Sequence, residues 1–422
     1  MISIKTFKSA AFSSAVLIAL SLQTGGAQAE MSESEINERA EKIHANVVTV
    51  DTHVDVPLNY ASVYVDPARF TEAQVDLPKM RAGGLDAAFF IVYTPQGDLT
   101  EQGYGEALRI AETRLAAIKR MVRAYPEQIT LAESSKKVAS IARSGRRVAL
   151  VGMENAFPLG PSIERAEYWR DQGVRYMGIT HFGHNQFGDS SNPNTAKGET
   201  EDKFGGLSDL GRELVAELNR LGVMVDVSHA GKKTMMQATA LSKAPVIASH
   251  SGAMGVSNSP RNLDDEQFKA LAENGGVAQM VAFDTYVKPL NEEQIAFRKD
   301  LAKELGIETR EKRSKASKAV LDEYRERAQE VWEIAARATV SDFVDHIDHA
   351  VKIAGVDHVG IASDFDGGGG VVGWDDASET LNVTRELVRR GYSSADIEKI
   401  WGGNLLRVLR DVQAVSRTLN RS

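Results

Sequence analysis

The sequence predicts a (β/α)8 TIM barrel, an α/β fold in which eight parallel strands close into a cylinder inside a ring of helices. Three observations predict it. Short apolar or β-branched runs alternate with longer amphipathic segments along the 422 residues. Several runs, such as VALVGM and HVGIAS, are nearly continuous in apolar residues, which is typical of strands covered on both faces. The first run is not followed by the glycine-rich phosphate turn of an open doubly wound sheet.

Eight runs are predicted as strands, and one charged segment interrupts their spacing after the seventh. That segment covers 288–337, where FRKDLAKEL and VLDEYRERAQEVWEIAARA predict amphipathic helices. We interpret it as a helical insertion with a solvated surface, the alternative being a lid over the site. The predicted strands cover residues 47–51, 85–93, 147–154, 174–180, 223–229, 245–250, 275–283 and 358–364.

The first residues have the layout of a cleaved secretory signal, predicted to cover 1–29. Two lysines precede an apolar stretch over 15–22, and the small-residue pattern Ala-Gln-Ala ends at Ala29. The apolar stretch is well short of the roughly 20 residues that span a bilayer. We therefore expect an exported protein, periplasmic or extracellular, without a membrane anchor. Nothing marks a second domain, so 30–422 is predicted to form a single barrel domain.

The composition excludes two classes of function. The formal net charge is −8, and removing the two lysines of the signal makes the chain about two units more negative. That balance argues against nucleic acid as a partner, because a phosphate backbone binds basic surfaces. The chain contains no cysteine, so thiol ligands, thiol nucleophiles and disulfides are impossible. A core of this size does not need disulfides for an exported protein.

Side chains of the kinds that bind metals stand at the ends of six predicted strands. In (β/α)8 enzymes the reactive groups gather at the carboxyl ends of the strands. A buried histidine bonded to a nearby carboxylate is the commoner explanation for each residue alone, but convergence on one rim favours a metal site. In strand order these residues are His53 and Asp55, Glu154, His181, His229, His250 and Asp364.

Five of these residues suggest two metal ions rather than one, because a catalytic zinc generally uses three protein ligands. We assign His53, Asp55 and Glu154 to the first ion. Glu154 would also bind the second ion together with His229 and His250. Two zinc ions bridged in this way hold a hydroxide at neutral pH, polarise a carbonyl and stabilise an oxyanion. Manganese and cobalt also fit histidine and carboxylate ligands.

At these residues the sequence resembles the zinc-dependent renal (membrane) dipeptidase family, as an exported bacterial member. The resemblance implies a (β/α)8 barrel with two zinc ions that hydrolyses dipeptides, both L,L and L,D. Homodimers are common in that family, and lactam-ring hydrolysis is an implied side activity. The matching segments run in family order over almost the whole mature chain: VDTHVDVPLNY, DLPKMRAGGLDAAFF, GMENAFPL, GVRYMGITHF, MVDVSHAG, PVIASHSGA, SNSPRNLDDEQF and VGIASDFDG.

The resemblance also implies roles for three further positions. His181 in GITH would steady the oxyanion, Arg261 in SPRNL would pair with the terminal carboxylate of the substrate, and Asp364 in SDFDG would carry a proton to the leaving amine. A guanidinium fork suits a carboxylate, and a longer peptide would place its carboxylate out of reach. The alternatives are a plain surface arginine for Arg261, His184 in place of His181, and Asp366 in place of Asp364.

The sequence departs from the family pattern at two places. The family commonly has a tyrosine after strand seven that lines the substrate site, and MVAFDTYVK offers Tyr286 in an ambiguous register. The insertion that follows is longer than in the animal enzymes, so the substrate entrance is expected to differ.

Two other functions remain open. One is hydrolysis of a lactone, cyclic amide or phosphoester on the same barrel. Such enzymes often carry His-x-His on strand one and a modified lysine on strand four, whereas this chain has His-x-Asp and takes its bridge from Glu154. The other is an exported metal-binding protein without catalysis. Asp364 and His181 argue against it, because metal storage needs no proton shuttle.

Overall fold

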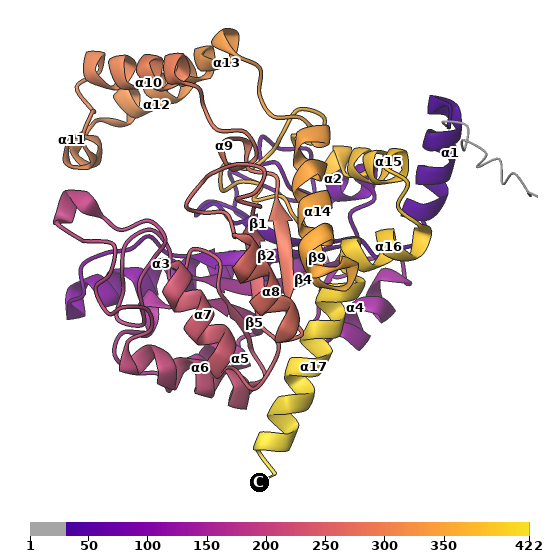
Figure 1. Cartoon of the computed structure of the whole chain (residues 1–422), viewed down its shortest axis with the longest axis horizontal. Helices are drawn as coiled ribbons and strands as arrows, with labels where there is room; N and C mark the ends of the chain where they lie inside the picture. The colour runs from indigo at the N-terminus through magenta and orange to yellow at the C-terminus, as the bar shows by residue number, and fades with distance from the viewer. Residues whose placement is uncertain (1–30, 422) are drawn as a thin grey trace, which may run out of the picture.

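The computed structural model describes residues 31–421, apart from the side chains of residues 310, 311 and 314. The predicted signal segment, 1–29, lies outside the described residues. A parallel sheet forms the centre of the molecule and helices surround it (Figure 1). Its strands are β1 (Val50–Asp55), β2 (Ala87–Tyr93), β3 (Ile129–Leu131), β4 (Arg147–Glu154), β5 (Val174–Gly178), β6 (Met224–Asp226), β7 (Ile247–Ser251), β8 (Val277–Val281) and β9 (Val359–Ala362).

Eight of the strands follow one another around a nearly closed barrel. Their order is β1-β2-β4-β5-β6-β7-β8-β9, every pairing is parallel, and β3 pairs with β4 outside this path. The two ends of the path meet where Val54 bridges Phe365 in parallel, with Asp55 N donating to Phe365 O at 2.8 Å and Asp364 N donating to His53 O at 3.0 Å. The predicted (β/α)8 barrel is therefore confirmed.

The observed strands differ from the predicted ones by a few residues at most ends, and three differences matter most. The first strand was expected at 47–51 but runs over Val50–Asp55, so His53 and Asp55 lie within it and not beyond its end. The fifth predicted strand, 223–229, is cut to β6, because the chain turns at His229, whose φ is 64°. The short strand β3 was not predicted, since it has three residues and a single strand partner.

Alternate residues of the strands pack on opposite faces, which explains their nearly continuous apolar runs. In β2, Phe89 belongs to the core inside the barrel, while Phe90 belongs to the core between the barrel and its helices. Both side chains are buried. Burial of one large apolar side chain stabilises the fold by roughly 1.5–3 kcal/mol, so a strand apolar on both faces is strongly held. This arrangement confirms strands that are covered on both sides.

Helices cover the outside of the barrel, and one closes its lower end. That helix is α17 (Asn404–Leu419), whose Leu409 packs into the core inside the barrel. Its Arg407 donates to Gly275 O and Asp357 O, which precede β8 and β9. The amino ends of the strands are therefore plugged, and the carboxyl ends are left for a site. The other helices outside the insertion are α1 (Glu33–His44), α2 (Leu77–Gly83), α3 (Glu101–Ala124), α4 (Ser135–Ala142), α5 (Arg165–Asp171), α6 (Asp209–Leu221), α7 (Lys232–Leu241), α8 (Asp265–Glu273), α9 (Asp284–Val287), α14 (Val340–Ala354), α15 (Leu381–Arg389) and α16 (Ser394–Glu398).

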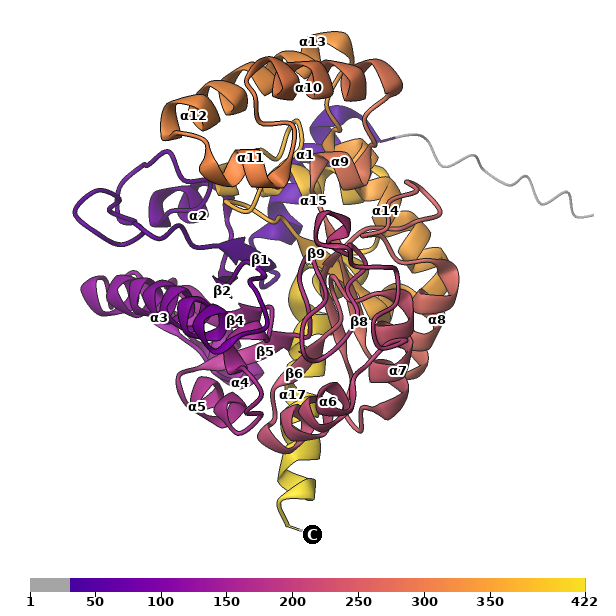
Figure 2. The same cartoon turned by 90° about the vertical axis from the view of Figure 1, so that its left-hand side faces the viewer.

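The predicted insertion is a helical layer of its own over one end of the barrel, as Figures 1 and 2 show. It comprises α10 (Glu292–Glu304), α11 (Arg310–Lys315), α12 (Lys318–Arg327) and α13 (Val331–Ile334). Gln294 Nε2 ties α10 to the backbone of Val331, and Arg327 pairs with Glu304 at 2.7 Å. At its base, Asp284 accepts hydrogen bonds from Arg337 Nε at 2.6 Å and from Ala338 N at 2.7 Å, which holds entry and exit together.

One glycine in the barrel wall makes room for a buried tyrosine of the neighbouring strand. A Cβ placed on Gly152 in β4 would lie 2.3 Å from Cζ of Tyr176 in β5, so the buried tyrosine ring lies directly against the glycine backbone. Only glycine permits this approach. No helix among the residues that the structure describes is both long and apolar enough to cross a bilayer.

Candidate metal centre

Seven polar side chains from six strands or strand ends meet at the carboxyl end of the barrel. His53 and Asp55 belong to β1 and, being two residues apart, lie on the same side of the strand. Glu154 ends β4 and His250 lies within β7. Six of the seven residues are buried, and the side chain of the seventh, His181, is 15% exposed. The other three follow β5, β6 and β9: His181, His229 and Asp364.

Glu154 lies at the centre of this group and presents its two oxygens to different partners. Oε1 is 2.9 Å from Nε2 of His229 and 3.3 Å from Nε2 of His250. Oε2 is 3.6 Å from Nε2 of His53. The same Nε2 of His53 is also 3.6 Å from Oδ2 of Asp55 and 3.8 Å from Oδ1 of Asp364. A carboxylate that divides its oxygens between two sets of ligands has the geometry of a bridge between two ions.

Three overlapping clusters have ligand atoms within 4.8 Å of one another: His53, Glu154 and His250; Glu154, His181 and His229; and His53, Asp55 and Asp364. Glu154 is shared by two of them, as expected for a binuclear site. His250 groups with His53 and His181 groups with His229, but Nε2 of His229 and Nε2 of His250 are also only 2.9 Å apart beside Oε1 of Glu154. All five predicted ligands are thus brought together, and their division between two ions stays a prediction.

The donor atoms show that this centre fits cations. The Nδ1 atom of His53 is 3.0 Å from Tyr176 Oη, whose hydroxyl donates to Thr52 O, so His53 must donate from Nδ1. Its Nε2 then carries a lone pair and faces three carboxylates. This buried Nε2 has no hydrogen-bond partner among the described residues. Buried acceptors that face one another need a positive charge between them.

The pKa values of His53 and Glu154 are shifted in directions that also favour positive charge at this centre. Burial lowers the pKa of His53, but the carboxylates of Glu154, Asp55 and Asp364 outweigh burial and raise it well above its usual value. Burial disfavours ionised Glu154, but the positive charges of His181 and His53 prevail and hold its pKa well below the usual range. Both shifts favour positive charge beside an ionised carboxylate, which is the state a metal ion stabilises.

The two remaining predicted ligands are neutral imidazoles. Burial lowers the pKa of His229 well below its usual value, and the charge of Arg261 adds to the effect. Burial likewise lowers the pKa of His250, with a contribution from His53. Neutral imidazole is the form that binds a metal. Asp364 differs, because burial and the charges of Asp55 and Glu154 raise its pKa well above that of an ordinary carboxyl, against the opposing effect of His53.

Two of these residues have strained backbone. His229 has φ 64° and Asp364 has φ 60°, in the left-handed region that non-glycine residues seldom adopt. Such a conformation costs roughly 1–3 kcal/mol per residue and persists only where the surroundings enforce it. At Asp364 the bond from its N to His53 O and the bond from Gly369 N to its own O provide this support. The strain directs both side chains into the centre.

A cavity of about 420 Å³ opens above the centre and is called the catalytic cavity below. Tyr286 lines it, as predicted for the residue after the seventh predicted strand. Arg261 is 2% exposed, so it is no plain surface arginine. Its guanidinium lies 5.4 Å from the ring centroid of Tyr286, and it donates to His250 O at 2.9 Å. Arg261 itself lines a small neighbouring cavity of about 80 Å³ together with His229.

The comparison with protein families decides the family. A family model described as membrane dipeptidase (peptidase family M19) matches residues 37–422. The chain belongs to the membrane dipeptidase family. Dipeptidase aclJ of Aspergillus oryzae is 30% identical over 395 residues, which cover 90% of this chain and 81% of that protein. Dipeptidase verJ of Clonostachys rogersoniana is 30% identical over 403 residues, covering 91% and 89%.

Solved structures agree with this membership. The crystal structure of the probable dipeptidase PvdM from Pseudomonas aeruginosa superposes with a TM-score of 0.82 at 34% identity, covering 90% of this chain and 99% of that one. A metallopeptidase from Rhodobacter sphaeroides, liganded with a phosphinate mimic of the dipeptide L-Ala-D-Ala, shares the fold with a TM-score of 0.65 at 22% identity, covering 87% and 99%. The chain is thus a dipeptidase of the M19 metallopeptidases.

Two competing residues in this M19 dipeptidase have structural partners instead. His184 is buried, with Nε2 at 2.7 Å from Thr200 O and Nδ1 accepting from Ser190 N at 3.0 Å. Asp366 accepts hydrogen bonds from Gln74 N at 2.9 Å and from Val75 N. His184 does not line the catalytic cavity, whereas Asp366 lines its edge. The geometry therefore favours His181 and Asp364 over these two.

Sequence reasoning missed the residues that hold the histidine ligands. Tyr176 orients His53, as described above. His250 Nδ1 is 2.8 Å from Ser249 Oγ, and Ser249 donates that hydroxyl to Asp226 Oδ2 at 2.7 Å, so His250 must donate from Nδ1. Such outer partners fix the tautomer and orientation of a ligand. Ser249 and Asp226 stand in the same motifs as His250 and His229, which is the signal that could have identified them.

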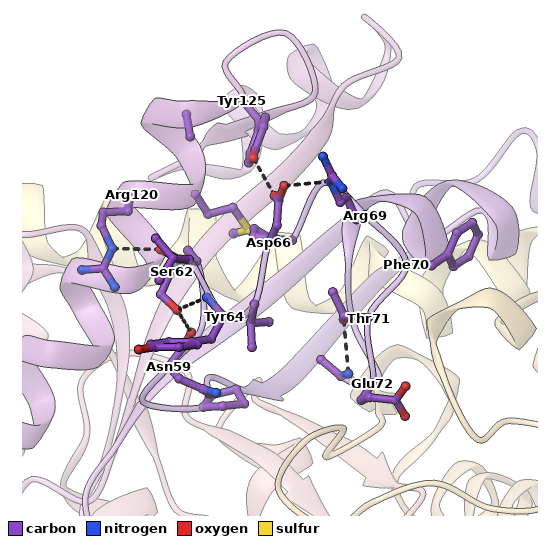
Figure 3. A pocket seen from close by; sticks show the side chains of 18 of the residues that line it. Asn59, Ser62, Tyr64, Asp66, Arg69, Phe70, Thr71, Glu72, Arg120 and Tyr125 are labelled. Carbon is purple, nitrogen blue, oxygen red and sulfur yellow. Dashed lines mark hydrogen bonds and ion pairs between the residues drawn. The ribbon is translucent and has the colours of Figure 1, made fainter.

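A wide surface depression of about 1290 Å³ lies beside the catalytic cavity and shares Pro57 and Asp366 with it. Figure 3 shows part of its wall, which is formed largely by the segment after β1. There Tyr125, which follows α3, donates a hydrogen bond to Asp66, and Arg69 pairs with the same carboxylate. None of the seven side chains of the metal centre lines this depression, so its surface is distinct from the ligand cluster.

Tyr176→Phe is expected to lower the affinity for divalent metal by about 10- to 100-fold, because buried Nδ1–H of His53 loses its acceptor and the ring its orientation. Competition with a chelator measures this affinity. Tyr60→Phe is the matched control, since the Tyr60 hydroxyl donates to Val75 O away from the ligands. Equal metal affinity in Tyr176→Phe and the wild type would show that the tyrosine does not orient the ligand.

Proposed function

We propose that this protein is a binuclear zinc dipeptidase that hydrolyses L,L and L,D dipeptides. The observation that carries the proposal is the divided carboxylate of Glu154, with Oε1 close to His229 and His250 and Oε2 close to His53. Membership of a dipeptidase family supports the substrate class. The Rhodobacter sphaeroides relative, which holds a mimic of L-Ala-D-Ala, supports acceptance of a D-residue at the carboxyl-terminal position.

Two zinc ions would be held by His53, Asp55 and Glu154 on one side and by Glu154, His229 and His250 on the other. Bound there, two zinc ions would supply Lewis acidity and a water molecule of lowered pKa at neutral pH. The protein's own part would be to present His229 and His250 as neutral imidazoles, to keep Glu154 ionised and to limit the access of bulk water. The directions of the pKa shifts of these three residues meet the first two requirements, and their burial meets the third.

Arg261 sets the length of the substrate in this proposal. Its buried guanidinium adjoins Tyr286 and His250, which both line the catalytic cavity. Among the described residues its Nε has no hydrogen-bond partner, so a donor remains for an incoming carboxylate. A dipeptide whose carbonyl lies over Glu154 would bring its terminal carboxylate to this side of the cavity. A longer peptide would have an uncharged amide there instead.

His181 and Asp364 both line the catalytic cavity, where the reacting bond would lie. His181 Nε2 is 3.7 Å from Glu154 Oε1 and, with its side chain 15% exposed, faces the cavity, where it steadies the oxygen of the former carbonyl. Asp364 lines the same cavity, and its Oδ1 lies 3.8 Å from Nε2 of His53. From there it takes the proton of the attacking water and delivers it to the leaving amine.

The first prediction concerns substrate length. Purified protein with about two zinc ions per chain by elemental analysis should hydrolyse L,L and L,D dipeptides, and tripeptides about 100-fold more slowly because they lose the carboxylate contact. Rates on a stereochemically complete panel, followed by amine release, measure this. A protein that carries both ions and is inert on every dipeptide would rule out the proposed activity.

The second prediction separates proton transfer from metal binding. Asp364→Asn should keep the full metal content and lower kcat by at least about 100-fold, because an amide cannot carry the proton. Turnover and elemental analysis of the same sample test this, with thermal unfolding as the control for folding. Unchanged turnover would remove the catalytic role, and loss of one metal would make Asp364 a ligand.

We also propose that the enzyme is exported, periplasmic or extracellular, on the evidence of the signal-like residues 1–29. Mass spectrometry of the amino terminus after cell fractionation should find a chain that begins near Glu30 outside the cytoplasm. An intact chain that starts at Met1 and stays in the cytoplasm would contradict this proposal.

A further inference from the structure

The helical insertion contributes one side chain to the mouth of the barrel. In Figure 2, α11 lies on the side of the insertion that faces the barrel strands. Arg313 of this helix lines a chamber of about 300 Å³, here called the Arg313 chamber. Its other lining residues come from the segments that follow β2 and β5: Tyr93, Pro95, Gln96, His181 and Phe182.

The Arg313 chamber adjoins the catalytic cavity directly. Tyr93, His181 and Phe182 line both spaces. His181 is also the residue proposed to steady the carbonyl oxygen, so a side chain near the reacting bond lies next to the chamber. A dipeptide bound over Glu154 can therefore place one of its side chains there without leaving the metal centre.

The chamber has a single positive charge and no carboxylate among its lining residues. Arg313 Nε donates to Ile307 O at 2.9 Å, and its guanidinium lies 5.5 Å from the ring centroid of Tyr324. These two contacts within the insertion hold the Arg313 side chain in position. Arg313 is exposed, and among the side chains that the structure describes no carboxylate forms an ion pair with it. An exposed guanidinium held at this wall suits an anionic ligand group.

The position of the chamber identifies which residue of the substrate enters it. Arg261 follows β7 and contacts Tyr286, which follows β8. The Arg313 chamber lies on the other half of the barrel, at the ends of β2 and β5. If the carboxyl-terminal residue extends toward Arg261, the amino-terminal residue lies beneath His181 and its side chain points into the chamber.

We propose that the Arg313 chamber is a subsite for an acidic side chain on the amino-terminal residue of the dipeptide. The enzyme would then prefer dipeptides that begin with glutamate or aspartate over their amide counterparts. Phe182 and Tyr93 would contact the methylene groups, and Arg313 the carboxylate. This inference rests on the proposed dipeptidase activity and adds to it a substrate class.

The test compares kcat/KM for Glu-Ala, Gln-Ala and Ala-Ala. Arg313→Gln should lower the value for Glu-Ala by about three- to tenfold, the range expected for an ion pair that remains partly exposed to water. Its values for Gln-Ala and Ala-Ala should stay within about twofold of the wild type, because neither substrate has a charge for the arginine to bind. Arg325→Gln, an equal change at an exposed residue of α12, is the matched control and should alter none of them.

Two further measurements separate an ion pair from a structural effect. Raising the ionic strength should reduce the preference of the wild type for Glu-Ala over Gln-Ala, since salt screens an exposed charge. Arg313→Glu should reverse the preference, favouring Lys-Ala over Glu-Ala. Affinity for phosphinate mimics of Glu-Ala and Ala-Ala should change in parallel, which tests binding without turnover.

The outcomes distinguish this subsite from the dipeptidase activity itself. Hydrolysis of Ala-Ala without any preference for Glu-Ala over Gln-Ala would overturn the subsite and leave the dipeptidase intact. An equal loss on all three substrates in Arg313→Gln would also overturn it, because the arginine would then support the fold of the insertion. Failure of every dipeptide with both metals bound would contradict the proposed function instead.

Discussion

The site depends on one electrostatic constraint: several hydrogen-bond acceptors are buried facing one another around Glu154. The closed barrel fixes this arrangement, because the ligands come from different strands and cannot separate without opening the sheet. Isolated in a low-dielectric interior, such a group would repel itself. Cations bound between these ligands would turn the repulsion into attraction, so the residues that repel one another would also supply the affinity for metal.

Much of the fold and most of the candidate site could be predicted from the residues, for a physical reason. Strands buried on both faces must be apolar along their length, so the barrel strands appear in the sequence as runs. Ligands at strand ends stand out against those runs, as His229 and His250 do. The start of β1 was misplaced because its buried residues include Asp51, Thr52 and His53, whose polar side chains resemble the end of a strand.

The remaining features depend on contacts between distant parts of the chain. Nothing near His53 in the sequence points to Tyr176, since the contact requires the gap above Gly152 in the neighbouring strand. The grouping of His53 with His250 likewise follows from the curvature of the closed sheet. The insertion was expected to be a solvated surface, and most of it is exposed, but its helix α11 also carries Arg313 to the barrel mouth. Arg313 is itself exposed, so composition alone cannot distinguish it from the other exposed charged residues of the insertion.

Asp284 has a wider consequence for how such enzymes diversify. Asp284 precedes α10 and binds Arg337 and Ala338, which follow α13. Both ends of the insertion are therefore held at one point on the barrel. A loop whose ends are already closed adds little entropic penalty when it is lengthened or exchanged. The roof of the substrate site can therefore be rebuilt through insertions and deletions while the floor, with its metal ligands, keeps its register. Substrate selectivity and catalysis thus depend on different segments of one domain, and the two segments can change independently during evolution.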